Sequence, residues 1–242
     1  MALPTFSAFV PSALTERARV AVDHIAFRIA ATEDALAAFV RPGQFVKMRV
    51  RAEDGALHEG IFALPSAPFE RRLAFVARTS NPDGGEAADR VAVMAIGAGL
   101  EVTLPAGDGF PLERARGRDL AFVCVGTAIA PVRSALEVVL RDRASFGALS
   151  LDYGLRSLAH SPMPDDLDRW RMLGVRVALH VSSPRADGTV DGPRAQDALF
   201  ARLGPRTRGT AIVAVGHPAL VADVRARVAA AGGDGSLVLV NH

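Results

Sequence analysis

The sequence predicts two successive domains, an antiparallel β-barrel followed by an α/β domain built on a parallel sheet. The chain has 242 residues, half of them hydrophobic, and such a chain can bury two cores of about 110–130 residues each. The spacing of the apolar residues changes partway along the chain, after a polar connection that contains proline and glycine, "PAGDGFPLERARGRD". We therefore place the first domain at residues 1–115 and the second at residues 116–242.

Short apolar runs separated by turns predict the barrel. Between Arg19 and about Leu104 the runs typical of strands are "RVAVDHIAFRIA", "GQFVKMRV", "GIFAL", "RLAFVARTS" and "GLEVTLP". Turn signals such as "RPG", "EDG" and "NPDGG" lie between them. Several short strands joined by turns favour a small antiparallel barrel. Val91, Met94 and Ala95 stand at helical spacing, so we expect one short helix at an end of the barrel.

Alternating strands and helices predict the parallel sheet of the second domain. The apolar strands are "LAFVCV", "GALSLDYG", "VRVALHV", "TAIVAV" and "SLVLVN", and this alternation is typical of a parallel sheet with helices on both faces. The helical stretches between the strands begin near Pro131, Pro164, Arg194 and Pro218.

A group of aspartates, Asp165, Asp166 and Asp168, lies at one of these helix starts. Negative charge there is favoured by the helix dipole, so we interpret the group as helix capping and predict no metal site.

Composition excludes several functions. Basic and acidic residues are interspersed and leave a formal net charge of +2, which does not indicate a nucleic-acid-binding surface. The one cysteine, Cys124, excludes an internal disulfide and a four-cysteine metal or iron–sulfur site. Any redox chemistry therefore needs an organic cofactor or a partner. The sequence shows neither a signal peptide nor an apolar run of about eighteen residues, so we expect a cytoplasmic protein without a membrane span.

The stretch "GTAIAPVRS" marks a candidate ligand site. It lies between the first strand and the first helix of the second domain, and open parallel sheets bind ligands at the carboxyl ends of their strands. Gly126 allows a close backbone approach, Thr127 offers a hydroxyl, and Pro131 begins a helix whose free N–H groups can bind a phosphate. An ordinary tight turn would have the same residues, and the stretch alone does not decide between these interpretations.

An ordered series of motifs resembles the ferredoxin-NADP reductase-like family of flavoprotein oxidoreductases. In chain order the motifs are "RPGQFVKMRV", "IFALPSAP", "VGTAIAPVRS", "LDYGLRS", "AVGHPAL" and "LVNH", and they extend from about Arg19 to His242. The resemblance implies a Greek-key barrel that holds FAD and a Rossmann-like domain that holds NAD(P)H. It also implies hydride transfer from the nicotinamide to the flavin, with electrons leaving for a ferredoxin, another redox protein or a small molecule. No Ser-His-Asp arrangement, HExxH or CxxC motif indicates other chemistry.

A second hypothesis stays open beside this one. The chain departs from the family pattern at several positions. It could be a relative that keeps the fold, has weakened flavin or hydride chemistry, and acts as a nucleotide-binding or interaction module.

The resemblance assigns flavin contacts in the barrel. The family signature Arg-x-Tyr-Ser/Thr corresponds here to Gly60–Ala63. Phe62 keeps an aromatic face for the flavin ring, Ala63 lacks the hydroxyl near the flavin N5, and Gly60 lacks the guanidinium that would hold the pyrophosphate. Leu64 and Ser66 follow as further flavin contacts.

The next strand and helix supply the remaining flavin contacts that the resemblance implies. Ala77 and Arg78 correspond to a strand that contributes backbone contacts and often a basic residue, and Gly85 and Arg90 belong to the pyrophosphate turn. We hypothesise that Arg78 or Arg90 supplies the charge missing at Gly60. The alternative is that both are ordinary solvated arginines.

The nucleotide turn departs from the family at two glycines. The family's Gly-Gly-Thr-Gly-Ile-Ala-Pro becomes Val125–Pro131, so a glycine is replaced at Val125 and at Ala128. Gly126, Thr127, Ala128 and Pro131 are the pyrophosphate contacts that the resemblance implies.

The "YGxR" motif lies on the following strand. Arg156 is the basic residue assigned to the adenosine end of the dinucleotide, and Tyr153 and Gly154 complete the motif. As the single tyrosine of the chain, Tyr153 could equally be a core residue. The choice between NADH and NADPH stays open.

Two positions near the end of the chain complete the predicted site. Many relatives have Cys-Gly close to the hydride path, where this chain has Val215 and Gly216. His242 lies where relatives often have an aromatic ring over the flavin, and we take it as the candidate catalytic residue. A frayed terminal histidine without a role is the alternative. Cys124 is interpreted as a small core residue and not as a substitute thiol.

Overall fold

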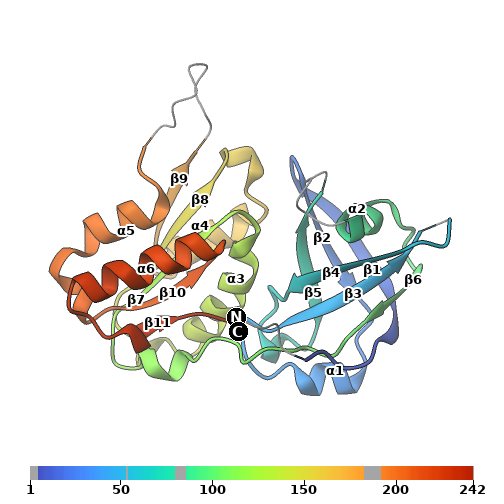
Figure 1. Ribbon diagram of the computed structural model, residues 1–242, viewed down its shortest axis with the longest axis horizontal. Coiled ribbons are helices and arrows are strands. Elements are labelled where there is room, and N and C mark those ends of the chain that lie inside the picture. The colour runs from blue at the N-terminus through green and yellow to red at the C-terminus, as the bar shows by residue number, and fades with distance from the viewer. Residues whose placement is uncertain (1–4, 53, 80–85, 183–191, 242) are drawn as a thin grey trace.

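The protein has two sheets that lie side by side, each with its own helices (Figure 1). This computed structural model describes residues 5–52, 54–79, 86–182 and 192–241. Strands between Val10 and Val102 form an antiparallel sheet, and strands between Leu120 and Leu239 form a parallel one. The predicted fold class, a barrel followed by a Rossmann-like domain, is confirmed. The boundary between residues 115 and 116 stays a prediction.

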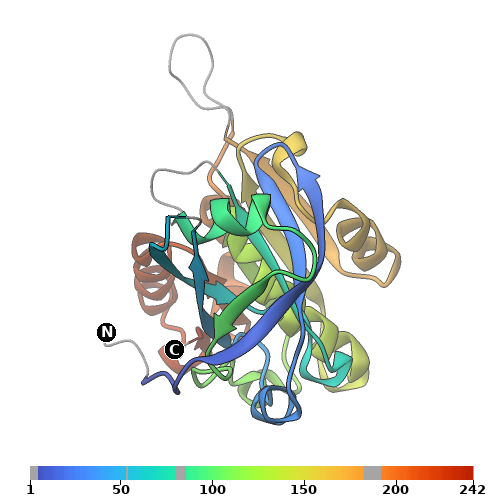
Figure 2. The same cartoon turned by 90° about the vertical axis from the view of Figure 1, so that its right-hand side faces the viewer.

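The first sheet has six strands in the order β4-β3-β6-β1-β2-β5, and all of its pairings are antiparallel. Figure 2 shows that the sheet is strongly curved. The two outer strands, β4 and β5, each pair on one side only. The strands are β1 (Val10–Ala21), β2 (His24–Ile29), β3 (Phe45–Arg51), β4 (Leu57–Ala63), β5 (Leu73–Arg78) and β6 (Gly99–Val102).

The first strands differ from the prediction in two ways. The run that begins at Arg19 was predicted as one strand, but a turn at Val22 and Asp23 divides it between β1 and β2. β1 begins earlier, at Val10, and most of its side chains are at least partly exposed, which leaves little apolar alternation to detect.

Two α-helices lie in the part of the barrel that the structure describes. The predicted helix is present as α2 (Glu86–Val93), with Val91 buried. An additional helix, α1 (Glu33–Ala38), was not predicted. It begins after Thr32, whose hydroxyl accepts a hydrogen bond of 3.1 Å from the Ala35 N–H.

The second sheet has five parallel strands in the order β11-β10-β7-β8-β9. All five predicted strands are present: β7 (Leu120–Val125), β8 (Leu149–Leu155), β9 (Arg176–Val181), β10 (Ala211–Val215) and β11 (Val238–Leu239). The α-helices begin close to the predicted residues: α3 (Ile129–Arg141), α4 (Pro164–Met172), α5 (Ala195–Leu203) and α6 (Pro218–Ala230).

Short 3₁₀ helices connect several of these elements. They are η1 (Pro68–Glu70), η2 (Leu112–Ala115), η3 (Gly126–Ala128), η4 (Arg143–Ser145), η5 (Leu158–His160), η6 (Gly204–Arg208) and η7 (Gly235–Leu237).

Each sheet buries its own apolar core. Phe27, Phe62 and Phe75 pack together inside the barrel, with ring centroids 5.0–6.1 Å apart. In the second domain the largest fully buried side chain is Trp170. Cys124 is fully buried in the same core, and burial raises the pKa of its thiol, so it is a core residue as predicted.

A set of polar contacts fixes the two domains to each other. The Arg133 guanidinium on α3 donates to both carboxylate oxygens of Glu70, to the Pro65 carbonyl and to Asp166. The buried Ser134 hydroxyl donates to the Ser66 carbonyl at 2.6 Å. We call this set the interdomain clamp. It joins the first turns of α3 to the chain that follows β4.

The "RPGQF" motif forms a second junction. Gly43 has a φ of 90° and packs against Phe110, whose ring lies 2.6 Å from the position that a Cβ would take. The Asn241 side-chain amide donates to the Gly43 carbonyl at 3.0 Å. Glycine is required here by both the backbone angle and the space.

Over the described ranges, no helix is long and apolar enough to cross a membrane. Among the same residues, there is no group of three or more His, Cys, Asp or Glu side chains that could hold a metal ion. In the aspartate group at the start of α4, Asp166 pairs with Arg133 and Arg169.

Candidate functional site

A crevice of about 1260 Å³ lies between the two domains. Its barrel side comes from β4, β5, the β1–β2 turn and α2, and its other side from the loops at the carboxyl ends of β7, β8, β9 and β10. This is the end of a parallel sheet at which ligands bind. The sequence-predicted residues that line the crevice are Phe62, Ala63, Ala77, Arg78, Gly126, Thr127, Ala128, Pro131, Gly154, Arg156 and Gly216.

Four of the predicted residues that the structure describes are not part of this lining. Leu64, Ser66, Arg90 and Tyr153 are placed elsewhere by the structure. Gly85 and His242 lie outside the described residues, so their predicted roles remain predictions.

The turn after β7 is shaped by Gly126. This residue has a φ of 55°, which glycine adopts without strain. Residues Gly126–Ala128 form η3, and α3 follows directly with Pro131 in its first turn. The turn therefore presents backbone and the Thr127 side chain to the crevice in front of a helix N-terminus, an arrangement that suits an anion.

Tyr153 supports this turn from behind. Its side chain is fully buried, and its hydroxyl donates to the Gly126 carbonyl at 3.0 Å. Burial raises the pKa of the phenol, so it stays protonated and remains a donor. The core placement considered from the sequence is the one observed, and Tyr153 does not reach the crevice. It acts on the candidate site through Gly126.

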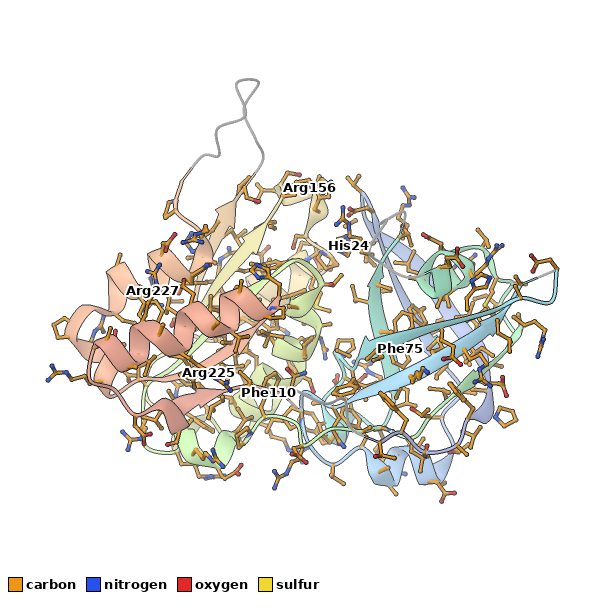
Figure 3. All side chains as sticks on the ribbon, in the orientation of Figure 1. His24, Phe75, Phe110, Arg156, Arg225 and Arg227 are labelled. Carbon is orange, nitrogen blue, oxygen red and sulfur yellow. The ribbon has the colours of Figure 1, made fainter. Side chains whose placement is uncertain are left out.

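Gly154 and Arg156 continue β8 into the crevice. Gly154 packs against Val125, whose Cγ1 lies 2.9 Å from the position that a Cβ would occupy. Arg156 is exposed at the strand end, and Figure 3 shows it across the crevice from His24. Gly216 lies at the end of β10, with a φ of 154°.

Several residues on this side were missed from the sequence. His160, His180, Ser182 and Arg194 also line the crevice. The available signal was topological, since His180 and Ser182 lie at or just beyond the carboxyl end of β9. His180 bonds to the buried Asp152, with 3.1 Å between Nε2 and Oδ1. Arg194 pairs with Asp197 and is therefore already neutralised.

The barrel side differs from the predicted flavin contacts. Phe62 is 93% buried and packs edge-on against Phe27 and Phe75, so its ring belongs mainly to the barrel core. A Cβ at Gly60 would lie 2.9 Å from the Phe62 ring and 3.3 Å from Ala87. Gly60 therefore leaves no space for a side chain in this packing.

Leu64 and Ser66 are buried and make other contacts. Leu64 is fully buried in the barrel core. The Ser66 hydroxyl accepts a hydrogen bond from the Ala74 N–H at 3.2 Å, and its carbonyl accepts from Ser134 in the interdomain clamp. Their placement supports the crevice from behind β4 and joins the domains.

Arg78 lies in the crevice but already has a partner. Its Nε donates to Asp23 at 2.7 Å. Burial opposes the charge on Asp23, but the hydrogen bond from Arg78 and the neighbouring positive charges together outweigh it and hold the pKa of the carboxyl below its usual range. Burial also lowers the pKa of the adjacent His24, which favours a neutral imidazole. Arg90 is exposed on α2 and does not line the crevice.

Comparisons with known proteins agree with this geometry. Residues 122–226 match the oxidoreductase NAD-binding domain family. The electron transfer subunit of dihydroorotate dehydrogenase B (NAD(+)) from Shouchella clausii (strain KSM-K16) is 33% identical over 94 residues. That alignment covers 38% of this chain and 35% of the relative, so little more than a third of that protein is matched.

Solved structures with a similar fold cover nearly the whole chain. The flavohaem-like FAD/NAD-binding domain of nitric oxide dioxygenase from Vibrio cholerae is 16% identical, with a TM-score of 0.78 and coverage of 95% of this chain and 96% of that one. A ferredoxin NADP+ reductase from Neisseria gonorrhoeae, with bound FAD and NADP, is 20% identical, with a TM-score of 0.75 and coverage of 93% and 92%. A cytochrome P450 reductase from Amycolatopsis is 21% identical, with a TM-score of 0.79 and coverage of 99% and 71%.

These findings define a two-domain protein with the architecture of FAD- and NAD(P)-binding reductases. The chain has the fold of the ferredoxin reductase-like family, and its second domain matches the NAD-binding domain of oxidoreductases. The fold implied by the sequence motifs is confirmed.

Proposed function

We propose that this chain is an NAD(P)H-dependent flavin oxidoreductase. It would transfer a hydride from NAD(P)H to a flavin such as FAD and pass the electrons to a separate acceptor, either a redox protein such as a ferredoxin or a small molecule. The observation that carries the proposal is the shared crevice, in which β4 and β5 of the barrel face the Gly126–Ala128 turn. A flavin would supply the redox chemistry, and this chain would supply binding and orientation.

The α/β side of the crevice suits the dinucleotide. The turn at Gly126 and Thr127 offers an anion site at the start of α3, and Arg156 lies beyond the neighbouring strand. The matched NAD-binding domain family and the fold of the reductases support this assignment. Cytoplasmic location remains a prediction from the sequence.

The barrel side suits the ring of a flavin. Phe62, Ala63 and Ala77 give it an apolar lining, and β4 and β5 are outer strands whose outer edges pair with no other strand of the sheet. Such edges present backbone N–H and carbonyl groups. Both features match a planar ring with a polar edge.

Flavin absorbance tests the proposal directly. Protein saturated with FAD should be yellow, and its absorbance should bleach when NADH or NADPH is added without oxygen. A protein that takes up FAD and resists bleaching by both nucleotides would instead support the nucleotide-binding or interaction module. A protein that binds no flavin at any concentration would overturn the oxidoreductase assignment.

A further inference from the structure

The barrel side of the crevice offers no space for a long side chain at Gly60. Its backbone packs beneath the Phe62 ring and beside Ala87, so that even a Cβ would lie 2.9 Å from the ring. Phe62 is held by Phe27 and Phe75, so its ring is not free to move aside. A cation cannot reach the crevice from this position without repacking the barrel core.

The charges on this side are already paired. Among the described barrel residues that line the crevice, the charged ones are Asp23 and Arg78, which bond to each other and sum to zero. His24 is 96% buried, and its lowered pKa keeps it uncharged at neutral pH. Arg90 lies outside the lining. No described barrel residue of the lining therefore offers an unpaired cation to a diphosphate.

The helix on this side does not favour a phosphate either. The first turn of α2 carries Glu86 and Asp89. Carboxylates in the first turn already compensate the helix dipole, so this helix start has less to offer an anion. By contrast, the first turn of α3 on the opposite side of the crevice contains no acidic residue.

The barrel side of the crevice provides strand edges that suit the ring of a flavin. Residues Gly60–Ala63 and Val76–Arg78 line this side, and they belong to the two outer strands of the sheet. Backbone groups along such edges can donate to and accept from the pyrimidine edge of a flavin, whichever chain is attached to N10.

We propose that the barrel side recognises a flavin by its isoalloxazine ring and not by its phosphates, so that riboflavin, FMN and FAD bind as exchangeable substrates. The inference rests on the proposed function and specifies its substrate class. The reaction is NAD(P)H + H⁺ + oxidised flavin → NAD(P)⁺ + reduced flavin. A C–H bond of the nicotinamide breaks with its electron pair, the hydride forms an N–H bond on the flavin, and the single proton of the equation is taken up from the solvent.

Calorimetry on the full chain measures the three dissociation constants. We expect the values for riboflavin, FMN and FAD to agree within about tenfold, a difference of about 1.4 kcal/mol. We also expect the FAD value to change by less than about threefold between about 0.05 and 0.5 M NaCl, since salt screens charge–phosphate contacts. FAD affinity that exceeds riboflavin affinity by more than tenfold, or that falls steeply with salt, would overturn the inference.

A double variant tests whether Arg78 binds a phosphate. Among the described residues, Arg78 is the one cation that lines the barrel side of the crevice. Asp23→Asn with Arg78→Gln removes both charges of the pair together, so that neither charge is left without the other. The ratio of riboflavin to FAD dissociation constants should stay within about threefold of the unmodified protein, because Arg78 serves Asp23 and not a phosphate. Asp108→Asn, at an exposed aspartate outside the crevice, is the matched control. A selective loss of FAD affinity in the paired variant would show that Arg78 holds the diphosphate.

Turnover separates this inference from the function on which it rests. With NADPH or NADH in excess and oxygen excluded, a small amount of protein should bleach a large excess of riboflavin. If FAD alone is reduced and stays bound, the oxidoreductase assignment stands and the exchange inference fails. If no flavin of any kind is bound or reduced, both fail.

Discussion

The two sides of the crevice handle charge in opposite ways. The α/β side has the Gly126 turn, a helix start without acidic residues and the exposed Arg156. The barrel side has a neutralised Asp23–Arg78 pair, an apolar side-chain lining and the backbone groups of two strand edges. Under the proposed function, phosphate binding and ring binding are divided between the two domains. The barrel lacks the family's basic residue at Gly60, and the α/β domain retains Gly126 and Thr127 although Val125 and Ala128 replace two glycines of the family's turn.

The largest effect, on the free energy of unfolding, is expected from breaking the interdomain clamp. Arg133→Met would remove the charge that faces Glu70 and Asp166 and leave two carboxylates at the junction without it. Breaking a buried ion pair costs about 3–5 kcal/mol. Arg133 and Glu70 both retain about 15% exposure, so we expect about 3 kcal/mol less free energy of unfolding in urea.

A matched arginine provides the control for this variant. Arg171→Met removes an exposed pair with Asp168 on α4 and should cost less than about 1 kcal/mol. Equal losses in the two variants would contradict a role for the interdomain clamp.

The same clamp should weaken in acid. Burial opposes ionisation of Glu70, but hydrogen bonds from Arg133 and the Ala67 N–H outweigh it and lower the pKa of the carboxyl. A lowered carboxyl pKa stabilises the fold above the unfolded value of about 4.3, and this stability is lost as the pH falls through the folded value. Thermal unfolding between about pH 3 and pH 6 should show the loss, and Glu70→Gln should flatten this dependence.

Changing the turn at Gly126 should weaken binding on the α/β side of the crevice and leave binding on the barrel side unchanged. Gly126→Ala forces an L-residue to a φ of 55°, a strain of about 1–2 kcal/mol. We expect NAD(P)H to bind about tenfold more weakly, because the turn relaxes away from its observed shape, while riboflavin affinity is unchanged. Fluorescence titration measures both.

Gly55 provides the matched control for the turn. Its φ is 86° in the β3–β4 connection, and no atom lies within 4 Å of the position that a Cβ would take. Gly55→Ala therefore carries a similar strain far from the crevice, and NAD(P)H affinity should not change. Weaker NAD(P)H binding in this variant would mean that the loss at Gly126 reflects general destabilisation.

The smallest effect is expected from restoring one polar group to the barrel side. Ala63→Ser places a hydroxyl on the crevice side of β4, where it can bond to a flavin ring. One added hydrogen bond is worth about 1 kcal/mol, so flavin affinity should rise by up to about fivefold, equally for riboflavin and FAD. Ala74→Ser on β5, outside this crevice, should leave it unchanged.

The elements predicted from sequence are those with local signals. The five parallel strands are buried apolar runs, and the prolines mark helix starts, so no tertiary information is needed to find them. The start of β1 and helix α1 were missed because their side chains are mostly exposed and lack apolar alternation.

The parts of the candidate site that lie at the carboxyl ends of the parallel strands could be predicted from the sequence. The turn after β7 and the strand end at Arg156 follow from parallel topology. The partners of Tyr153, Arg78 and Arg133 did not follow, because each is bonded to a residue distant in sequence. Only the fold brings those groups together.

The hydrogen bond from Asn241 to the Gly43 carbonyl has a consequence for assembly during protein synthesis. All six strands of the barrel precede residue 103, so they can pair as soon as that part of the chain has left the ribosome. The Asn241 amide is made 198 residues after Gly43 and can close this junction only when translation has passed both domains. Pairing of the barrel strands can therefore precede the closing of this junction.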